Sequence, residues 1–476
     1  MKELIDRLSE LEIASSGLEP NAEKRKELFT EIQNYTEAFI EDIDHGKSYF
    51  QNEEAIKNLE IDGKAHDLKE VLKNYDKEVT HRGINPASGG HVGYIPGGGI
   101  YTAALGDYLA DITNEYSGMH FGSPGAVAIE HEVLNWLKKI FGFPMSSVGN
   151  LPSGGSIANL IALTAARDQH EIKGAKVDRA VIYLSQQVHH CVQKALRIIG
   201  LGDVKIRYIS LDAGFRLKTS ELKAQIESDK SEGLQPFLVI ASAGTTDTGA
   251  VDPLNDIADI AESENLWYHV DAAYGGFFIL CDDTKHLFKG IERADSLVID
   301  PHKGLFLPYG VGAVLVKNRK AVLHSHHYVA NYMQDSYGSD MPLNPADVSP
   351  ELTKHFRALR VWLPLQLHGI EPFRACLDEK LVLTHYFRAL LLKEGFEVGP
   401  RPDLSVSYFY YPKEENENEY NKRLLELIHE DGRVFLSSTI IDGRFVIRMA
   451  ILSFRTKKHT IDTAMEMIMG AKKNIM

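Results

Sequence analysis

Apolar residues recur at helical spacing through the first 85 residues of the chain, where charged residues are plentiful and glycine is scarce. Amphipathic helices with few strand signals cannot easily form a core of their own. We therefore expect residues 1–85 to form a helical arm that packs on another part of the protein or on a second subunit. The positions that share this spacing are Leu4, Ile5, Leu8, Leu11, Leu28, Ile32, Phe39, Ile40 and Ile43.

Beyond Leu151 the pattern changes to short runs rich in Val and Ile that alternate with amphipathic stretches. This alternation predicts an α/β fold with a mainly parallel sheet that helices cover on both faces. Ligands of such sheets bind at the carboxyl ends of the strands, so the residues directly after each strand are the first candidates for a site. The predicted strands are 180–184, 205–211, 236–241, 266–270, 296–299 and 312–316, and the predicted helices between them include 190–199, 220–231 and 254–264.

The pattern changes again near residue 371. A helix is predicted over 377–393, strands over 405–411 and 445–451, and a last helix over 459–469, with a solvated loop over 412–419. The chain is thus expected to have three parts. These are the helical arm over 1–85, a large α/β domain over 86–370 and a small C-terminal α+β domain over 371–476.

The charge and cysteine content exclude several classes of protein. The formal net charge is −14, from 52 Lys and Arg against 66 Asp and Glu. This balance argues against a nucleic-acid partner and against a basic membrane anchor. The three cysteines are too few and too far apart for a disulfide framework. The first residues, MKELIDRLSELE, do not resemble a secretory signal, and no apolar run reaches the roughly 18 residues of a membrane span. We expect a soluble, cytoplasmic protein.

Two of the predicted strands lead into residues whose side chains could take part in a reaction. Asp271 follows strand 266–270, and Lys303 lies in an otherwise apolar stretch after strand 296–299. A partly desolvated lysine is expected to have a lowered pKa and to react with carbonyls as a nucleophile. Asp271 could keep a pyridine nitrogen protonated, or it could simply cap a helix.

A candidate anion site precedes the predicted helical run 157–167. The segment Ser153-Gly154-Gly155-Ser156 would allow close backbone approach, and the start of a helix attracts a phosphate. A serine N-cap after a glycine turn explains the same residues. No GxxxxGK[ST] motif and no strand-anchored GxGxxG motif is present, so a nucleotide loop is not supported.

Taken together, His189, the run HVDAAYGG at 269–276 and DPHKG at 300–304 resemble the group II pyridoxal-phosphate-dependent amino acid decarboxylases. This family includes aromatic amino acid, histidine and glutamate decarboxylases. The likeness continues in order along most of the chain beyond the arm, from His91 through RALRVWL at 357–363 to VIRMAILSFRT at 446–456. The ordered set is much more specific than any single motif.

The resemblance implies a fold type I enzyme (aspartate aminotransferase-like) that binds pyridoxal 5′-phosphate (PLP) and forms a homodimer with the active site at the interface. It implies that Lys303 is the Schiff-base lysine, that Asp271 pairs with the pyridine nitrogen and that His189 stacks on the ring. The resemblance also assigns the phosphate loop to Gly154, Gly155 and Ser156, the cofactor surroundings to Thr246 and His302, the substrate wall to Tyr94 and Pro96, and the proton-donating loop tyrosine to Tyr332, with Tyr337 as the alternative.

The implied reaction is decarboxylation of an L-amino acid to its amine and CO₂. Tyr94 and Phe121 favour an aromatic substrate. An acidic substrate (glutamate, aspartate or cysteine sulfinate) would require a cation in the pocket, and Arg82, Arg357 and Arg448 are the candidates. Two departures leave open a carbon–carbon lyase of the sphingosine phosphate lyase type. Gly304 stands where aromatic decarboxylases usually have Trp, and the phosphate loop reads Gly-Gly-Ser rather than the animal enzymes' Ser-Ala/Thr-Ser.

A hydrolase is the alternative from another class. Ser156 would be its nucleophile, with Asp271 and His302 following in hydrolase order. A nucleophile elbow must directly follow a strand, and residues 145–152 show no strand character. A hydrolase would also leave Lys303 unexplained. The histidines around Ser325 lack the spacing of a zinc site, so no metal is expected.

Overall fold

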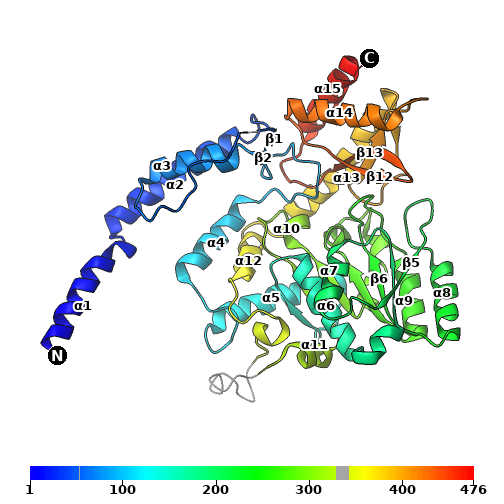
Figure 1. Cartoon of the computed structure of the whole chain (residues 1–476), viewed down its shortest axis with the longest axis horizontal. Coiled ribbons are helices and arrows are strands. Elements are labelled where there is room, and N and C mark those ends of the chain that lie inside the picture. The colour runs from blue at the N-terminus through cyan, green and yellow to red at the C-terminus, as the bar shows by residue number, and fades with distance from the viewer. Residues whose placement is uncertain (53, 329–341, 476) are drawn as a thin grey trace.

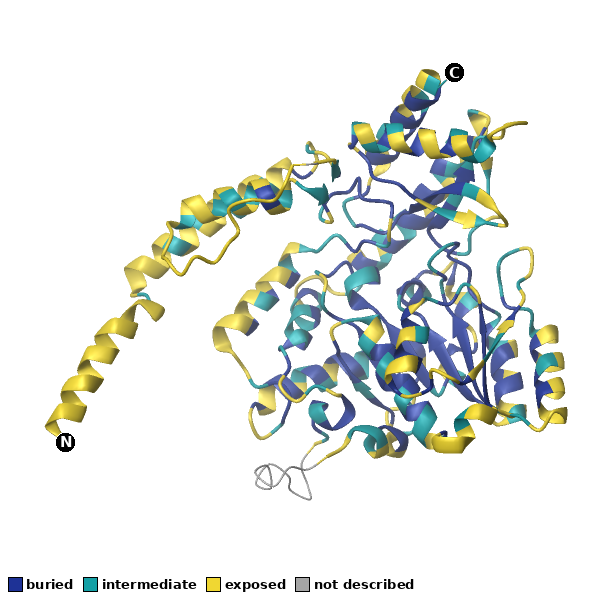
Figure 2. Cartoon of the chain, in the orientation of Figure 1, coloured by how far each residue is buried: buried dark blue, intermediate teal, exposed yellow. Residues whose placement is uncertain are grey.

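The N-terminal arm extends away from the rest of the protein. The structure is a computed structural model that describes residues 1–52, 54–328 and 342–475 (Figure 1). The arm contains α1 (Lys2–Ser15), α2 (Ala22–Asp42) and α3 (Leu68–Tyr75), and none of these helices has a buried residue (Figure 2). The short strands β1 (Tyr49–Phe50) and β2 (Gly83–Ile84) pair antiparallel where the arm joins the body. The predicted apolar stripe is thus present and largely exposed to solvent, whereas Ile43, directly after α2, is buried.

A seven-stranded sheet forms the centre of the body. Its order is β3-β9-β8-β7-β6-β4-β5. The strands β5, β4, β6, β7 and β8 pair parallel with one another in that order. At one edge, β9 pairs antiparallel with β8, and β3 pairs antiparallel with β9. The mainly parallel sheet expected from the sequence is confirmed. The strands are β3 (Val148–Asn150), β4 (Ala180–Ser185), β5 (Lys205–Ile209), β6 (Gln235–Ser242), β7 (Trp267–Asp271), β8 (Ser296–Ile299) and β9 (Ala313–Val316).

Alternate residues of the central strands enter two separate cores. In β4, Val181 and Tyr183 join one hydrophobic cluster, and Ile182 and Leu184 join the other. The first cluster includes side chains of α5, α8 and α9, and the second includes side chains of α6, α7 and α11, so helices cover both faces. The body helices are α4 (Tyr101–Thr113), α5 (Pro124–Phe141), α6 (Gly155–Gln169), α7 (Cys191–Ile198), α8 (Thr219–Ser231), α9 (Leu254–Glu264), α10 (Pro301–Gly304), α11 (Arg319–His326) and α12 (Arg357–His368).

The C-terminal part has its own antiparallel sheet, in the order β10-β11-β13-β12. A third hydrophobic cluster fills the space between this sheet and its helices. Val92, from the glycine-rich segment, is buried in that cluster, and its N–H donates to the Phe435 carbonyl at 3.1 Å. The elements are α13 (Glu371–Lys393), β10 (Glu397–Val398), β11 (Val406–Tyr410), α14 (Glu417–Asp431), β12 (Ser437–Ile441), β13 (Arg444–Ala450) and α15 (Lys458–Ile475).

Two expectations about local structure were wrong. Residues 145–152 do contain a strand, since β3 pairs antiparallel with β9 at the sheet edge. A three-residue Val-Gly-Asn strand shows no periodicity, and pairing to β9 supplies what local propensity lacks. The predicted loop over 412–419 ends early, because α14 begins at Glu417. The pattern also missed β12, whose residues are partly exposed.

Candidate active site

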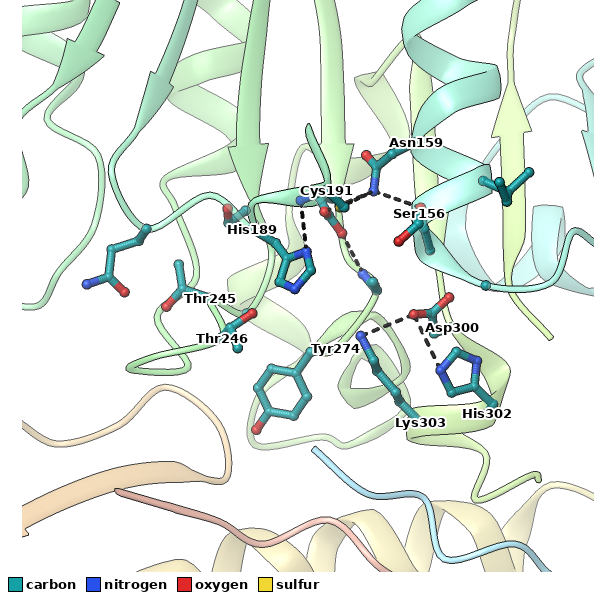
Figure 3. Close-up of a pocket in the computed structure, with 18 of the residues that line it drawn as sticks. Ser156, Asn159, His189, Cys191, Thr245, Thr246, Tyr274, Asp300, His302 and Lys303 are labelled. Carbon is teal, nitrogen blue, oxygen red and sulfur yellow. Dashed lines mark hydrogen bonds and ion pairs between the residues drawn. The ribbon is translucent and has the colours of Figure 1, made fainter. Parts of the chain in front are cut away.

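A cavity of about 340 Å³ opens at the carboxyl ends of β4, β6, β7 and β8, beside the start of α6 (Figure 3). This is the position that the parallel topology favours for a ligand. The residues that line it are Ser153, Gly154, Gly155, Ser156, Ile157, Asn159, Gln187, His189, Cys191, Ser242, Gly244, Thr245, Thr246, Asp271, Ala273, Tyr274, Asp300, His302 and Lys303. All the predicted cofactor-binding residues are therefore brought together.

Lys303 faces a carboxylate one helical turn away. Its Nζ lies 3.1 Å from Oδ2 of Asp300, and both side chains point into the cavity. Burial lowers the pKa of Lys303, but the charges of Asp300 and Asp271 and the hydrogen bond to Asp300 more than offset burial and raise it. The expected lowered pKa is thus wrong, because sequence reasoning counted the apolar neighbours and not the ion pair.

Asp271 is the last residue of β7 and is almost fully buried. Its Oδ1 accepts the N–H of Ala273 at 3.0 Å, and its Oδ2 accepts an amide hydrogen from Asn159 at 3.2 Å. The next helical turn begins only at Gly276 and has Gly275 as its N-cap, so Asp271 does not cap a helix. Its carboxylate is instead held at the cavity wall.

The start of α6 forms a tight cradle. Its N-cap is Gly154 rather than a serine, so the serine-cap interpretation was wrong. A Cβ on Gly155 would lie 2.9 Å from Oδ2 of Asp300 and 3.3 Å from Cβ of Ala273. Glycine thus leaves room where any side chain would intrude. The unpaired N–H groups of the first turn and the helix dipole favour an anion at this point.

Two imidazoles complete the cavity. Nδ1 of His189 accepts the backbone N–H of Cys191 at 3.2 Å, and burial together with the nearby His190 lowers the pKa of His189. Nδ1 of His302 donates to the Val311 carbonyl at 2.6 Å, and burial lowers the pKa of His302. Both rings are therefore favoured in their neutral form.

The remaining predicted residues lie elsewhere. Tyr94 is 56% exposed and packs against His91, and neither Tyr94 nor the buried Pro96 is among the described residues that line the cavity. Tyr332 and Tyr337 lie outside the described residues.

Sequence reasoning assigned no role to Asn159, Gln187, Cys191, Tyr274 and Asp300, all of which line the cavity. The position of Asp300 directly after strand 296–299 was a usable signal. Asn159 offered none, because it lies inside a helical run.

The hydrolase alternative fails on geometry rather than on the absence of a strand. Nδ1 of His302 is bonded to the Val311 carbonyl, and Asp271 is bonded to Asn159 and Ala273, so Asp271 does not orient His302 as the acid of a catalytic triad must. A hydrolase also gives no role to the Lys303–Asp300 pair.

The sequence matches the pyridoxal-dependent decarboxylase conserved domain over residues 51–408. The chain belongs to the pyridoxal-dependent decarboxylase family. It is 36% identical over 413 residues to the aromatic-L-amino-acid decarboxylase of Bacillus atrophaeus, and the alignment covers 85% of each chain. It is 29% identical to the aromatic-L-amino-acid decarboxylase of Sus scrofa, with 86% of this chain and 87% of the relative covered.

Solved structures agree on the fold. The structure of Oryza sativa TDC with PLP and tryptamine superposes on this decarboxylase with a TM-score of 0.90 at 24% identity, covering 96% of this chain and 99% of the other. Tryptophan decarboxylase of Catharanthus roseus, in complex with L-tryptophan, gives a TM-score of 0.88 at 23% identity, with 96% and 100% covered. The fold expected from the resemblance, that of the PLP decarboxylases, is confirmed.

This decarboxylase is thus a PLP-dependent carboxy-lyase, and the residues of the cavity fit the cofactor. A lysine for its aldehyde, a carboxylate for its ring nitrogen and a glycine cradle for its phosphate lie around one space of about 340 Å³.

Proposed function

We propose that this enzyme converts an aromatic L-amino acid into the corresponding amine and CO₂. The observation that carries the proposal is the convergence of Lys303, Asp271 and His189 from three strand ends on one cavity. The relatives support the substrate class, since they include tryptophan decarboxylase 2 of Oryza sativa and tyrosine decarboxylase 2 of Narcissus pseudonarcissus, each 29% identical.

The proposed roles follow from the positions of the side chains. When bound, PLP supplies an electron sink for the pair left behind as the substrate loses its carboxylate. Lys303 holds the cofactor through its amine, and Asp271 keeps a proton on the ring nitrogen. His189 packs its neutral ring on the cofactor, and Gly154, Gly155 and Ser156 hold the phosphate with backbone N–H groups. His302 and Thr246 shape the remaining wall.

The three candidate cations are already engaged, which supports an aromatic over an acidic substrate. Arg448 donates to the carbonyls of Thr246 and Gly93, at 3.0 Å and 2.6 Å. Arg357 pairs with Glu351 at 2.8 Å, and Arg82 pairs with Glu78 at 2.5 Å. A second carboxylate in the substrate would have to break one of these arrangements.

We assign the proton that replaces the lost carboxylate to Tyr332, with Tyr337 as the alternative. Tyr94 and Pro96 are proposed to contact the substrate side chain across a dimer interface, because neither lines the cavity of a single chain.

We propose a homodimer in which the arm over 1–85 packs on the partner, beside a large domain over 86–370 and a small domain over 371–476. The apolar side chains of α1 are exposed, and a second copy would bury them. The cytoplasm is the proposed location. Within the described residues, no helix combines the length and apolar character needed to cross a bilayer.

The function is tested with purified enzyme and a panel of L-amino acids that includes tryptophan, tyrosine, phenylalanine, glutamate, aspartate and cysteine sulfinate. We expect equimolar CO₂ and amine from an aromatic substrate, with kcat/KM at least 100-fold above that for any acidic one, on the order of 3 kcal/mol. Preference for an acidic substrate, or an aldehyde as the product, would contradict the proposal. Lys303→Ala should abolish the visible absorbance of the bound cofactor.

The proton donor is tested with a matched pair of variants. Tyr332→Phe should lower kcat for amine release about 100-fold or more and leave KM within about threefold, since general acid catalysis contributes 10²- to 10⁴-fold. Tyr337→Phe is the control and should remain close to the unaltered enzyme. The opposite pattern assigns the role to Tyr337, and full activity of both variants refutes a tyrosine donor.

A further inference from the structure

A continuous chain of buried hydrogen bonds ends at the carboxylate of Asp271. Nε1 of Trp267 donates to Oγ of Ser296 at 2.8 Å, and the same Oγ lies 2.8 Å from Nδ1 of His269. Nε2 of His269 lies 2.8 Å from Oδ1 of Asn159, whose Nδ2 donates to Oδ2 of Asp271 at 3.2 Å. Four links thus connect the interior of the sheet to the cavity.

The two ends of the chain determine the direction of every bond. The indole N–H of Trp267 can only donate, so the Ser296 hydroxyl accepts from it and keeps its own hydrogen available for Nδ1 of His269. At the other end a carboxylate can only accept, so Asn159 presents its amide hydrogens to Asp271 and its carbonyl to His269. His269 must therefore carry a proton on Nε2, and because the ring is neutral its Nδ1 accepts the hydrogen of the Ser296 hydroxyl.

Burial makes this arrangement rigid. His269, Ser296 and Asn159 have no exposed surface. Burial lowers the pKa of His269 to about 4, which keeps the ring neutral, although the charge of Asp271 acts in the opposite direction. The Cys191 thiol also lies beside the chain, with its Sγ 3.6 Å from Nδ2 of Asn159. The second amide hydrogen of Asn159 goes to the Gly155 carbonyl at 3.0 Å, so one side chain braces both Asp271 and the first turn of α6.

We propose that His269 and Asn159 are positioning residues that hold the Asp271 carboxylate aimed at the ring nitrogen of the cofactor. The proposal rests on the proposed role of Asp271. Neither His269 nor Asn159 needs to contact the substrate for this role. Asn159 transmits the orientation set by His269, because its carbonyl accepts from His269 while its amide group donates to Oδ2 of Asp271.

Two variants of His269 test the proposal: one removes the hydrogen bond to Asn159, and the other restores it. His269→Leu removes the donor to Asn159. It should weaken PLP binding about 10- to 100-fold and lower kcat by a similar factor, which is the range typical of residues that orient a ligand-binding side chain without contacting the ligand. KM for the amino acid should stay within about threefold. His269→Gln restores an N–H donor and should recover most of both losses. PLP affinity is measured by absorbance titration of the cofactor-free protein.

Tyr183→Phe is the matched control. Tyr183 is also fully buried on a central strand, and its hydroxyl donates to Asp229 at 2.9 Å, away from the cavity. It should lower thermal stability without altering PLP affinity or kcat. If His269→Leu behaves like Tyr183→Phe, the proposal is overturned.

Asp271→Asn separates this inference from the proposed function. Loss of PLP binding and activity in Asp271→Asn supports the role of Asp271, and adding His269→Leu to it should then cause less than a twofold further loss, because His269 acts through Asp271. Full activity of Asp271→Asn would instead defeat the proposed role of Asp271, whereas the decarboxylation itself is tested separately on the unaltered enzyme. Additive losses would defeat only the positioning role.

The protonation of His269 can also be measured by NMR in the unaltered protein. In cofactor-free protein labelled with ¹⁵N-histidine, His269 should give the nitrogen shifts of a neutral ring protonated on Nε2 at pH 7. A ring protonated on Nδ1 alone, or on both nitrogens, would contradict the direction of the chain.

Discussion

At the scale of single residues, the pair of Lys303 and Asp300 decides how the lysine behaves before the cofactor arrives. Nζ of Lys303 lies 3.1 Å from a nearly buried carboxylate, and its pKa is raised in spite of burial. The carboxylate of Asp300 stabilises the protonated amine of Lys303 in its pocket. A protonated amine cannot attack an aldehyde. We infer that the ion pair with Asp300 favours the protonated form of Lys303, which must lose its proton before it can react with an aldehyde.

Replacing Asp300 tests this interpretation. Asp300→Asn keeps the shape of the side chain and removes its charge, so the pKa of Lys303 should fall and more neutral amine should be present at pH 7. The rate of PLP incorporation should rise several-fold, and its increase with pH should move to lower pH, because the charge of Asp300 no longer raises the pKa of Lys303. The rate is followed by visible absorbance. The exposed Asp283→Asn is the control, and coincident pH profiles for all three proteins would argue against the interpretation.

At the scale of elements, the loop-to-helix junction at α6 is built for close approach. The junction lies between the strand ends, and Gly155 is packed against Asp300 and Ala273 so tightly that a methyl group does not fit. Gly125 occupies a comparable place in the first turn of α5, but nothing lies within 4 Å of where its Cβ would be. The same residue type thus has a steric reason in one helix and none in the other.

This contrast supplies a matched pair of variants. Gly155→Ala should weaken PLP binding at least tenfold, since Asp300 and Ala273 must shift into the cofactor's space. Gly125→Ala should leave PLP affinity within twofold and should raise stability by up to about 1 kcal/mol, because alanine favours a helix over glycine. Affinity is measured by absorbance titration and stability by thermal unfolding. Equal PLP affinities of Gly155→Ala and Gly125→Ala would show that an alanine side chain fits at position 155, which would contradict the steric argument.

At the scale of the whole molecule, the arm contacts the body at only part of its surface, for example where the ring of Phe29 in α2 lies 5.7 Å from that of Tyr108 in α4. The helices α1, α2 and α3 bury no residue, whereas the body has three hydrophobic clusters. The apolar side chains of α1, Leu4, Ile5, Leu8 and Leu11, are between 48% and 64% exposed. A stripe of this kind is typical of an interface rather than of a solvent-facing helix.

Light scattering should therefore give twice the chain mass of 53.2 kDa. Changing Leu8 and Leu11 together to Glu should weaken the dimer at least tenfold, because two charges would be buried at the contact. Val382→Glu introduces the same change at an exposed apolar position of α13 and should leave the dimer intact. A monomer at micromolar concentration in the unaltered protein would refute the homodimer.

Much of the architecture could be predicted because it depends on local patterns. The alternation of Val- and Ile-rich runs with amphipathic stretches predicted β8 over 296–299 and α9 over 254–264 with the bounds that the structure has. Parallel topology then placed Asp271 and Lys303 at one edge of the sheet. The failures were short or exposed pieces, β3 and β12, where pairing with a neighbouring strand outweighs the preferences of a few residues.

Pattern and motif by themselves determined that this chain folds as an α/β protein, that it resembles the PLP decarboxylases and which strand ends carry its chemistry. Only the tertiary structure decided the state of those groups. The raised pKa of Lys303 depends on the distance to Asp300, and the bracing of Asp271 depends on Asn159, which is 112 residues away in sequence. Hydrogen bonds and charges act over a few ångströms in space, and a linear pattern records no such distances between segments.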